Sequence, residues 1–177
     1  MPTTSQCTRT GYTLLGWSTS NTATSATYSP GASYTPTKTI TLYAVWQEIT
    51  YDVVYVNGSI NGGDTYTVSV KYTATHTFLD AAAVGFSKTG HTLTGYRIKR
   101  SANSGQWRVY NKDTDTSSWE TAATIEAGNY TYVEQAPGYN STYHRGCGGT
   151  LWLYAQWKAN TYTVSYNANG GSGAPAS

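Results

Sequence analysis

The phrase TGYTLLGW at residues 10–17 recurs almost letter for letter as TGHTLTGY at residues 89–96. A second pair follows in the same order, TLYAVW at 41–46 and WLYAQW at 152–157. Phrases repeated in a fixed order predict a repeated structural unit. Arrays of such units more often provide reach and display than catalysis.

Each copy of the second phrase runs into a Tyr-centred segment, ITYDVVYVNGSINGG from Ile49 and ANTYTVSYNANGGSG from Ala159. The repeat therefore aligns Gly11 with Gly90 in the opening phrases, Leu42 with Leu153 in the second phrases and Tyr51 with Tyr162 in the Tyr-centred segments. The second copy has a longer chain between its two phrases than the first copy has. We call the enlarged region, roughly residues 97–150, the insert.

Alternating apolar residues predict strands at both phrases. In the first, Tyr12, Leu14 and Gly16 are expected on one face, and Thr13, Leu15 and Trp17 on the other. In the second, Leu42, Ala44 and Trp46 point one way and Tyr43 and Val45 the other, which is typical of a central strand. We expect the two copies to be equivalent, with these correspondences: Trp17, Leu42, Tyr43 and Trp46 with Tyr96, Leu153, Tyr154 and Trp157.

Between the phrases, residues 64–72 alternate like a strand, and residues 77–84 favour a short helix with Asp80 near its N-terminus. One unit therefore follows the order β-β-α-β-β. Within the insert, QWRVYN (106–111) and NYTYVEQ (129–135) also alternate and predict a hairpin or small sheet.

Composition agrees with a β-rich chain, because 17 Tyr and 6 Trp accompany only 11% charged residues. A net charge of +2 argues against a nucleic-acid partner. The densest basic run, Arg97, Lys99 and Arg100, is interpreted as a solvated strand edge. No apolar stretch approaches the roughly 20 residues that span a bilayer, so we expect no membrane insertion. The opening MPTTSQCTRT lacks a signal-peptide core, so an export signal lies outside this sequence or does not exist.

The phrases TGYTLLGW, TLYAVW and YTVSYNANGGSGAP, in this order, resemble the Listeria-Bacteroides repeat, a relative of the B-repeat of listerial internalin. The resemblance implies a mostly β (α+β) chain of tandem small β-grasp-like modules, the second enlarged by the insert. It also implies an extracellular setting on a secreted or surface-anchored bacterial protein, or alternatively in a phage virion. Tyr96 and His91 depart from the usual residues of the family but keep a ring, so their packing role should survive.

The same resemblance places the chain out of register with its modules. Residues 1–47 correspond to the C-terminal half of one module, and residues 48–158 to a complete module with the insert. Residues 159–177 correspond to a first strand. That strand either starts a following module, completes the first half-module of the same chain, or adds to a neighbouring copy by strand exchange.

Few residues offer chemistry. Cys147 lies three residues after His144, without the further ligands that zinc needs. Cys7 and Cys147 are a candidate disulfide in an exported protein. Alternate oxygen-bearing residues, Asn111, Asp113 and Asp115, are a weak candidate calcium loop that lacks the turn Gly and the bidentate Glu of an EF-hand. We expect no enzyme and no cofactor.

Aromatic residues are dense in the insert, interleaved with neutral hydrogen-bonding residues. Such rings suit sugars and protein hot spots, or else the core of an added hairpin. The candidate ligand-binding set is Trp107, Tyr110, Trp119, Tyr139 and Tyr143. The favoured function is a structural spacer or adhesive module whose partners are neighbouring modules and host or bacterial surface proteins or glycans. The alternative is a carbohydrate-binding module that uses the insert.

Overall fold

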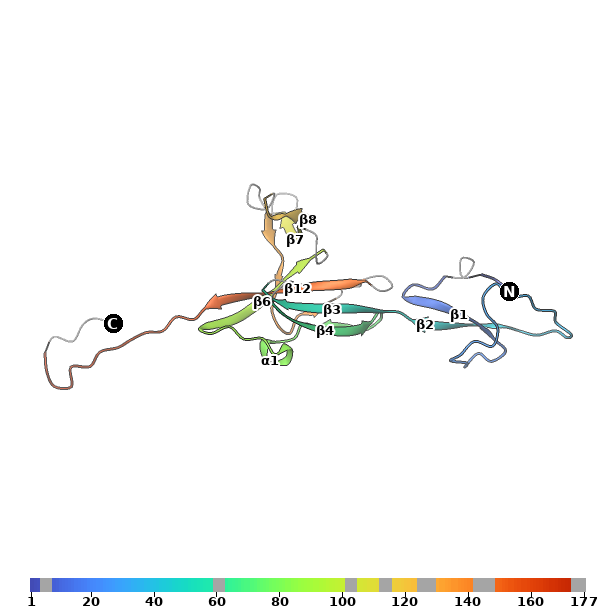
Figure 1. Ribbon diagram of the computed structural model, residues 1–177, viewed down its shortest axis with the longest axis horizontal. Helices are drawn as coiled ribbons and strands as arrows, with labels where there is room; N and C mark the ends of the chain where they lie inside the picture. Colours follow the sequence, from blue (N-terminus) through green and yellow to red (C-terminus); the bar gives the residue numbers. More distant parts are fainter. Residues whose placement is uncertain are drawn as a thin grey trace.

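Two β-structured units lie along the longest axis of the molecule (Figure 1). A C-terminal segment without regular secondary structure extends from the end opposite the N-terminal unit (Figure 1). The computed structural model describes residues 1–3, 8–58, 63–100, 105–111, 116–123, 130–141 and 149–172. We refer to residues 1–48 as the first unit, residues 49–159 as the second unit, and residues 160–172 as the tail. The described elements are mostly strands, with one short helix among them.

The first unit contains an antiparallel pair of strands, β1 (Tyr12–Ser18) and β2 (Tyr43–Glu48). Both predicted phrases are therefore strands. Because β2 pairs only with β1 in the described chain, the prediction that it is a central strand is wrong.

The second unit is built on a mixed sheet in which neighbours follow the order β4-β3-β12-β6. Strands β3 (Thr50–Asn57) and β12 (Thr150–Ala159) run parallel at its centre, and the other neighbours are antiparallel. Strands β4 (Asp64–Lys71) and β6 (His91–Lys99) flank this central pair. The second copy of the TLYAVW phrase, WLYAQW, does form a central strand, because β12 pairs with β3 as well as with β6, whereas β2 has no such second partner among the described residues.

Helix α1 (Ala81–Val84) lies between β4 and β6 in the chain, as the sequence predicts. The Asp80 side chain caps it by accepting a hydrogen bond from the Ala83 N–H at 2.8 Å. Gly85 ends the helix in the left-handed region, at φ 71°. The helix is shorter than the predicted segment because Asp80 is its N-cap, with extended backbone at φ −80° and ψ 175°, and because Thr77 belongs to β5 (His76–Thr77).

The two phrase pairs adopt the same register. When Gly16 is aligned with Gly95 and Trp46 with Trp157, as the sequence repeat requires, every pair between β1 and β2 has a counterpart between β6 and β12. Leu14 opposite Trp46 becomes Leu93 opposite Trp157, and a β-bulge at Leu15 recurs at Thr94. The predicted equivalence of the two copies is confirmed for these strands.

The bulge corrects one detail of the predicted strand faces. Leu14 lies opposite Trp46 and Trp17 lies opposite Ala44. Because Trp46 and Ala44 are two residues apart on β2, they share a face, so Trp17 shares the face of Leu14. The simple alternation that placed Trp17 on the opposite face is wrong, because the extra residue of the bulge shifts the chain by one position.

The glycine near the end of the first phrase, Gly16 or Gly95, lies directly against the backbone of a later segment of the chain, which we call the crossing segment. In the first unit the backbone of Thr27 and Tyr28 hydrogen-bonds to Trp17, and a Cβ on Gly16 would lie 2.2 Å from the Tyr28 carbonyl oxygen. In the second unit β10 (Glu134–Gln135) pairs with β6, and a Cβ on Gly95 would lie 2.7 Å from the Gln135 carbonyl oxygen. The phrase is repeated with its glycine because both copies pass a strand-like segment over that point.

The insert extends the main sheet beyond β6 and projects to one side of the long axis (Figure 1). Strand β7 (Gln106–Asn111) pairs with both β8 (Thr116–Thr121) and β9 (Tyr130–Tyr132), so the predicted small sheet is confirmed.

The crossing segments show where the extra chain enters the second unit. In the first unit, Tyr28 pairs with Trp17 and follows it closely in the chain. In the second unit, Gln135 pairs with Tyr96, and β7, β8 and β9 lie between these two residues in the chain. Most of the extra chain therefore precedes β10. After β10, β11 (Asn140–Ser141) pairs with β5.

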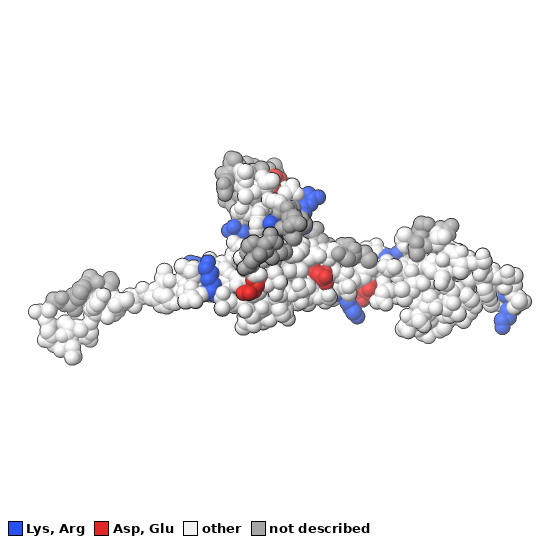
Figure 2. Space-filling model, in the orientation of Figure 1, with Lys and Arg blue, Asp and Glu red and all other residues white. Residues whose placement is uncertain are grey.

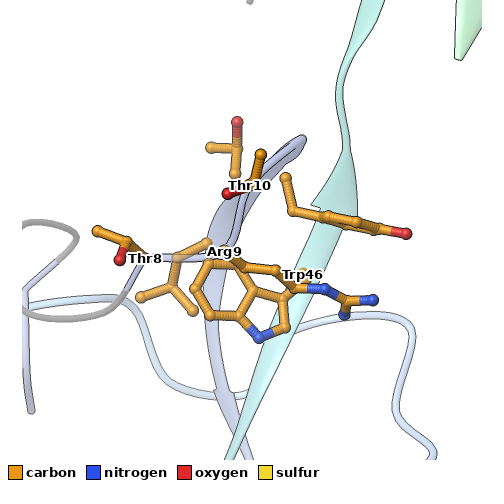
Figure 3. A pocket seen from close by; sticks show the side chains of 7 residues that line it. Thr8, Arg9, Thr10 and Trp46 are labelled. Atoms are coloured by element: carbon orange, nitrogen blue, oxygen red, sulfur yellow. The ribbon is translucent and has the colours of Figure 1, made fainter. Parts of the chain in front are cut away.

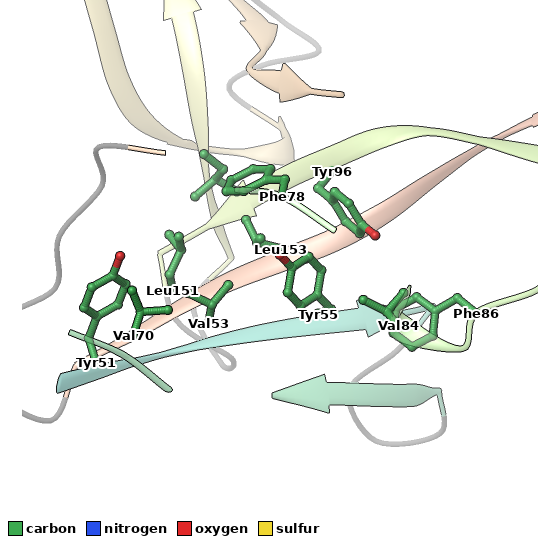
Figure 4. Packing of buried hydrophobic residues seen from close by; sticks show 11 residues of the cluster. Tyr51, Val53, Tyr55, Val70, Phe78, Val84, Phe86, Tyr96, Leu151 and Leu153 are labelled. Carbon is green, nitrogen blue, oxygen red and sulfur yellow. The ribbon is translucent and has the colours of Figure 1, made fainter. Parts of the chain in front are cut away.

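The main core lies on the face of the second unit's sheet that α1 covers (Figure 4). Alternate residues of the central strands supply it, since Tyr51, Val53 and Tyr55 of β3 are at most 1% exposed. Leu151 and Leu153 of β12 pack with them. Further members are Val70, Phe78, Val84, Phe86, Tyr96 and Ile98.

Candidate functional site

Aromatic side chains of the insert pack on the face of the sheet opposite the main core. Trp107 on β7 stands edge-on to Tyr154 of β12, with ring centroids 5.1 Å apart, and to Tyr132 of β9 at 6.0 Å. Trp152 and Trp107 also pack against the buried Val54 and Val56. Trp107, one of the candidate ligand residues, is therefore half-buried in a small second cluster that joins the insert to the sheet.

Cationic side chains lie over these rings. The Lys99 ammonium lies 5.3 Å from the Trp107 centroid and 5.1 Å from that of Tyr154, and the Arg97 guanidinium lies 4.1 Å from the Tyr132 centroid. Arg97 also forms an ion pair with Glu134 at 3.5 Å. Because β6 lies between β12 and β7, the interpretation of this basic run as a strand edge is wrong. Its alternate residues instead cover aromatic rings.

The candidate aromatic residues do not share one surface. Trp119 on β8 lies opposite Arg108, whose guanidinium lies 5.7 Å from its ring, so both point away from the Trp107 face. Trp119 and Tyr139 are half-buried against the main core, and Tyr139 lies 5.5 Å from Phe78. The structure thus brings Trp119 and Tyr139 to the same core cluster and places Trp107 on the opposite face of the sheet.

Several candidate residues lie outside what the structure describes. They are Tyr143, the candidate calcium ligands Asp113 and Asp115, and the candidate disulfide pair Cys7 and Cys147; the backbones of Tyr110 and Asn111 are described in β7 but their side chains are not. These assignments stay predictions. Among the described residues, no group of three or more His, Cys, Asp or Glu side chains is placed to hold a metal ion.

Tyr55 and His76 form a buried hydrogen-bonded pair that the sequence patterns do not predict. The Tyr55 hydroxyl lies 2.6 Å from His76 Nε2 and accepts a hydrogen bond from the Leu79 N–H at 3.1 Å. Tyr96 donates to the Leu79 carbonyl at 2.9 Å. The network ties β3 and β6 to the chain that precedes α1. The alternation of Tyr51, Val53 and Tyr55 was the available signal, but only the fold shows that His76 meets Tyr55.

Burial determines the protonation of this pair. Desolvation lowers the pKa of His76 and raises the pKa of Tyr55 to about 12. Both groups are therefore neutral at pH 7, and the Tyr55 hydroxyl donates to an unprotonated Nε2 while it accepts from Leu79. Tyr55 belongs to the main core, so its hydrogen bond to His76 joins β5 to that core.

Described residues of the first unit line two hollows on the face that corresponds to the main core. One, of about 330 Å³, is lined by Leu14 and Trp46 together with the Thr8–Thr10 segment, and Figure 3 shows the Arg9 and Trp46 side chains that line it. The other, of about 460 Å³, is lined by Ile40 and Leu42 with Met1, Tyr34, Pro36, Lys38 and Thr39. Trp46, Leu42 and Ile40 correspond to Trp157, Leu153 and Leu151, which pack in the core of the second unit. The hollows therefore lie where the second unit has its core.

Charged side chains form no large patch of one sign on the face shown in Figure 2. Figure 2 shows Lys and Arg side chains scattered singly or in small groups over the face in view, with Asp and Glu between them. No helix of the described residues is long and apolar enough to cross a bilayer.

The register shared by the two phrase pairs points to a repeat family, and comparison with known families agrees. Residues 1–45 match the Listeria-Bacteroides repeat domain. This repeat domain is typically a non-catalytic repeat of bacterial surface proteins. The matched residues hold β1 and the first half of β2, and the second unit repeats both strands in the same register.

A longer relative extends the comparison beyond the matched repeat domain. The chain is 27% identical, over 93% of its length, to a protein of Evansella cellulosilytica named "Putative Gly-rich membrane protein". The chain spans only 16% of that relative's length. No solved structure matches the chain.

Proposed function

We propose that this chain is a stretch of a repeat array in a bacterial surface or secreted protein, where each repeat is a β-grasp-like module that spaces or anchors its neighbours. A phage virion is the other setting for such an array. The second unit supports the β-grasp assignment through its β-β-α-β-β order, its strand order β4-β3-β12-β6 and its parallel central strands. On this proposal residues 48–158 are one complete module, residues 1–47 the end of another and residues 159–177 the start of a third.

The observation that carries the spacer role is the way the chain enters and leaves the second unit. It enters at Thr50, directly after Ile49, the single residue between β2 and β3. It leaves at Ala159, the end of β12, which is parallel to β3 and hydrogen-bonded to it from Thr150 to Tyr154. Tension applied through the neighbouring segments would therefore shear all of these hydrogen bonds together rather than open them one at a time.

Single-molecule pulling tests this role. Handles at residues 48 and 159 load β3 and β12 in shear. Handles at Thr50 and Lys71, which form the terminal pair of β3 and β4, peel that pair open from one end. We expect a higher unfolding force in the first geometry at equal loading rate, with one step that releases roughly 110 residues at about 3.5 Å each. Equal forces in the two geometries would refute a load-bearing role.

The carbohydrate-binding alternative rests on the half-buried aromatic residues of the insert, above all Trp107 beside Lys99. A glycan array with the intact chain and with Trp107→Ala and Trp119→Ala tests it. Glycan binding that each substitution removes without unfolding the second unit would favour this alternative. Binding to no glycan would leave the insert as a structural extension of the sheet.

A further inference from the structure

One residue, Ile49, separates β2 of the first unit from β3 of the second, and the two strands follow one another along the long axis (Figure 1). The backbone N–H and carbonyl of Ile49 are both hydrogen-bonded, each to a different unit. The N–H donates to the Gly11 carbonyl at 2.9 Å, and the carbonyl accepts from the Tyr72 N–H at 2.9 Å. Rotation of the backbone at Ile49 would therefore break a hydrogen bond to one unit or the other.

The Tyr72 side chain of the second unit lies against the first unit. A Cβ built on Gly11 would lie 2.3 Å from Cδ1 of the Tyr72 ring and 2.9 Å from its Cγ. Gly11 is buried and Tyr72 is half-buried. Because Cγ is the ring atom nearest the backbone, a small movement at the far end of the ring would not relieve this contact. The ring thus occupies the space that a side chain at Gly11 would need.

The second copy of the phrase separates this ring contact from the backbone conformation of the glycine. Gly11 and Gly90 occupy the same place in the two phrases and have the same left-handed backbone, at φ 79° and φ 68°. The Asn160 N–H donates to the Gly90 carbonyl at 2.8 Å, as the Ile49 N–H does to the Gly11 carbonyl. A Cβ on Gly90, however, would meet no described atom within 4 Å. The left-handed glycine and its hydrogen bond are therefore repeated, whereas the ring contact arises where the second unit meets the first.

A carboxylate connects the same two elements. Glu48, the last residue of β2, accepts hydrogen bonds at Oε1 from the Thr73 hydroxyl and from the Thr73 N–H, the latter at 3.0 Å. These hydrogen bonds lower the pKa of Glu48, and the nearby cations of Lys71 and Arg9 act in the same direction. Glu48 is therefore ionised at neutral pH, and hydrogen bonds to a charged acceptor are stronger than those between neutral groups.

We propose that the turn at residues 72–74 docks on the first unit and holds the two units in one fixed orientation, so that the chain is stiff at this point. Neighbouring domains ordinarily move relative to one another unless an interface holds them. Here the interface, which we call the joint, consists of the hydrogen bonds of Ile49 and Glu48 and the packing of Tyr72 on Gly11. In the repeat alignment Glu48 corresponds to Ala159, so the carboxylate contact is particular to this joint.

The inference rests on the proposed spacer role and specifies it. Each unit of a repeat array contacts its neighbours, and the interface between them contributes to the stability of both. A stiff joint adds that the distance between the far ends of the two units is fixed, whereas a flexible linker would let that distance vary.

Residual dipolar couplings of backbone amides test the proposal on the intact chain. Couplings from β1 and β2 are fitted separately from those of β3, β4, β6 and β12, and the two alignment tensors of the unsubstituted chain should agree in magnitude and direction. Tyr72→Ala removes the ring without adding strain and should lower the alignment magnitude of one unit relative to the other by about a third or more, because the units then reorient independently. Tyr66→Ala is the matched control, since Tyr66 lies within β4 and is 40% exposed. It should leave the tensors in agreement.

Gly11→Ala perturbs the joint from the side of the first unit. Its methyl would clash with the Tyr72 ring and would also be strained by the left-handed backbone. Gly90→Ala carries the same backbone strain without the clash, so it is the matched control. We expect Gly11→Ala to separate the two tensors, as Tyr72→Ala does, and Gly90→Ala to leave them in agreement.

Two results would overturn the proposal. One is a pair of tensors that already differ in the unsubstituted chain. The other is a Tyr72→Ala chain in which both units stay folded and the tensors still agree, and this variant decides the question even where Gly11→Ala unfolds the first unit. The couplings are measured without load, whereas pulling on residues 48–159 loads hydrogen bonds within the second unit. A stiff joint and a load-bearing second unit can therefore fail separately.

Discussion

Gly95→Ala should destabilise the second unit through one defined contact. The added methyl would lie 2.7 Å from the Gln135 carbonyl oxygen and 3.1 Å from the Gln135 carbonyl carbon. Both are backbone atoms, so relief requires β10 to move away from β6 and lose the pairs Glu134–Arg97 and Gln135–Tyr96. Overpacking of this kind costs about 1–3 kcal/mol. The loss of pairing adds to it, so we expect a decrease of about 2–3 kcal/mol in the free energy of unfolding.

Thermal and urea unfolding of the intact chain measure this change. For a unit of this size, a loss of about 2–3 kcal/mol lowers the Tm by roughly 10 °C. Gly105→Ala is the matched control, because its Cβ would meet no atom within 4 Å and its φ is not positive. It should change the free energy by less than about 0.5 kcal/mol. A Gly95→Ala variant as stable as Gly105→Ala would refute the crossing-segment explanation of the repeated glycine.

Three further predictions concern the buried network and the insert. Unfolded His76 binds a proton near its ordinary pKa of 6.5 while the folded side chain resists it, so stability should fall as pH drops below about 6.5. His76→Phe should flatten that part of a pH series of urea midpoints. Tyr55→Phe leaves the Leu79 N–H and His76 unpaired and should cost about 1–3 kcal/mol in urea unfolding. Trp107→Ala removes the ring contacts with Tyr154 and Tyr132 and should cost about 2 kcal/mol by the same assay, whereas an unchanged midpoint would place the ring outside the fold.

The repeated phrases allowed the strands and their equivalence to be predicted, because a strand signal is local and a repeat supplies it twice. The bulge at Leu15 and Thr94 was not predictable from alternation, since the extra residue is visible only against a partner strand. A central position was predicted for the TLYAVW strand and is found instead for β12, its counterpart in the second unit. That position depends on a non-local partner, β3, which the first unit lacks.

The candidate site shows the same limit. Aromatic density identified the insert, but the faces of Trp107 and Trp119 follow from the pairing of β7 with β8. Likewise, the sequence of Arg97 and Lys99 is typical of an exposed strand edge, and only the position of β7 beside β6 shows that these residues do not lie on one. The Tyr55–His76 contact joins residues that are distant in the chain and share no local pattern. Contacts of this kind come from packing between elements, which composition and periodicity do not encode.

The central claim is that the two phrase pairs form the same bulged strand pair in tandem units. Backbone nuclear Overhauser contacts across the strands test it most directly. The structure predicts contacts between Leu14 and Trp46 and between Trp17 and Ala44, with the same pattern between Leu93 and Trp157 and between Tyr96 and Ala155. A different register in either pair, or a regular pairing through Leu15 or Thr94, would contradict the claim, because a shift of one residue would turn each apolar face away from its core.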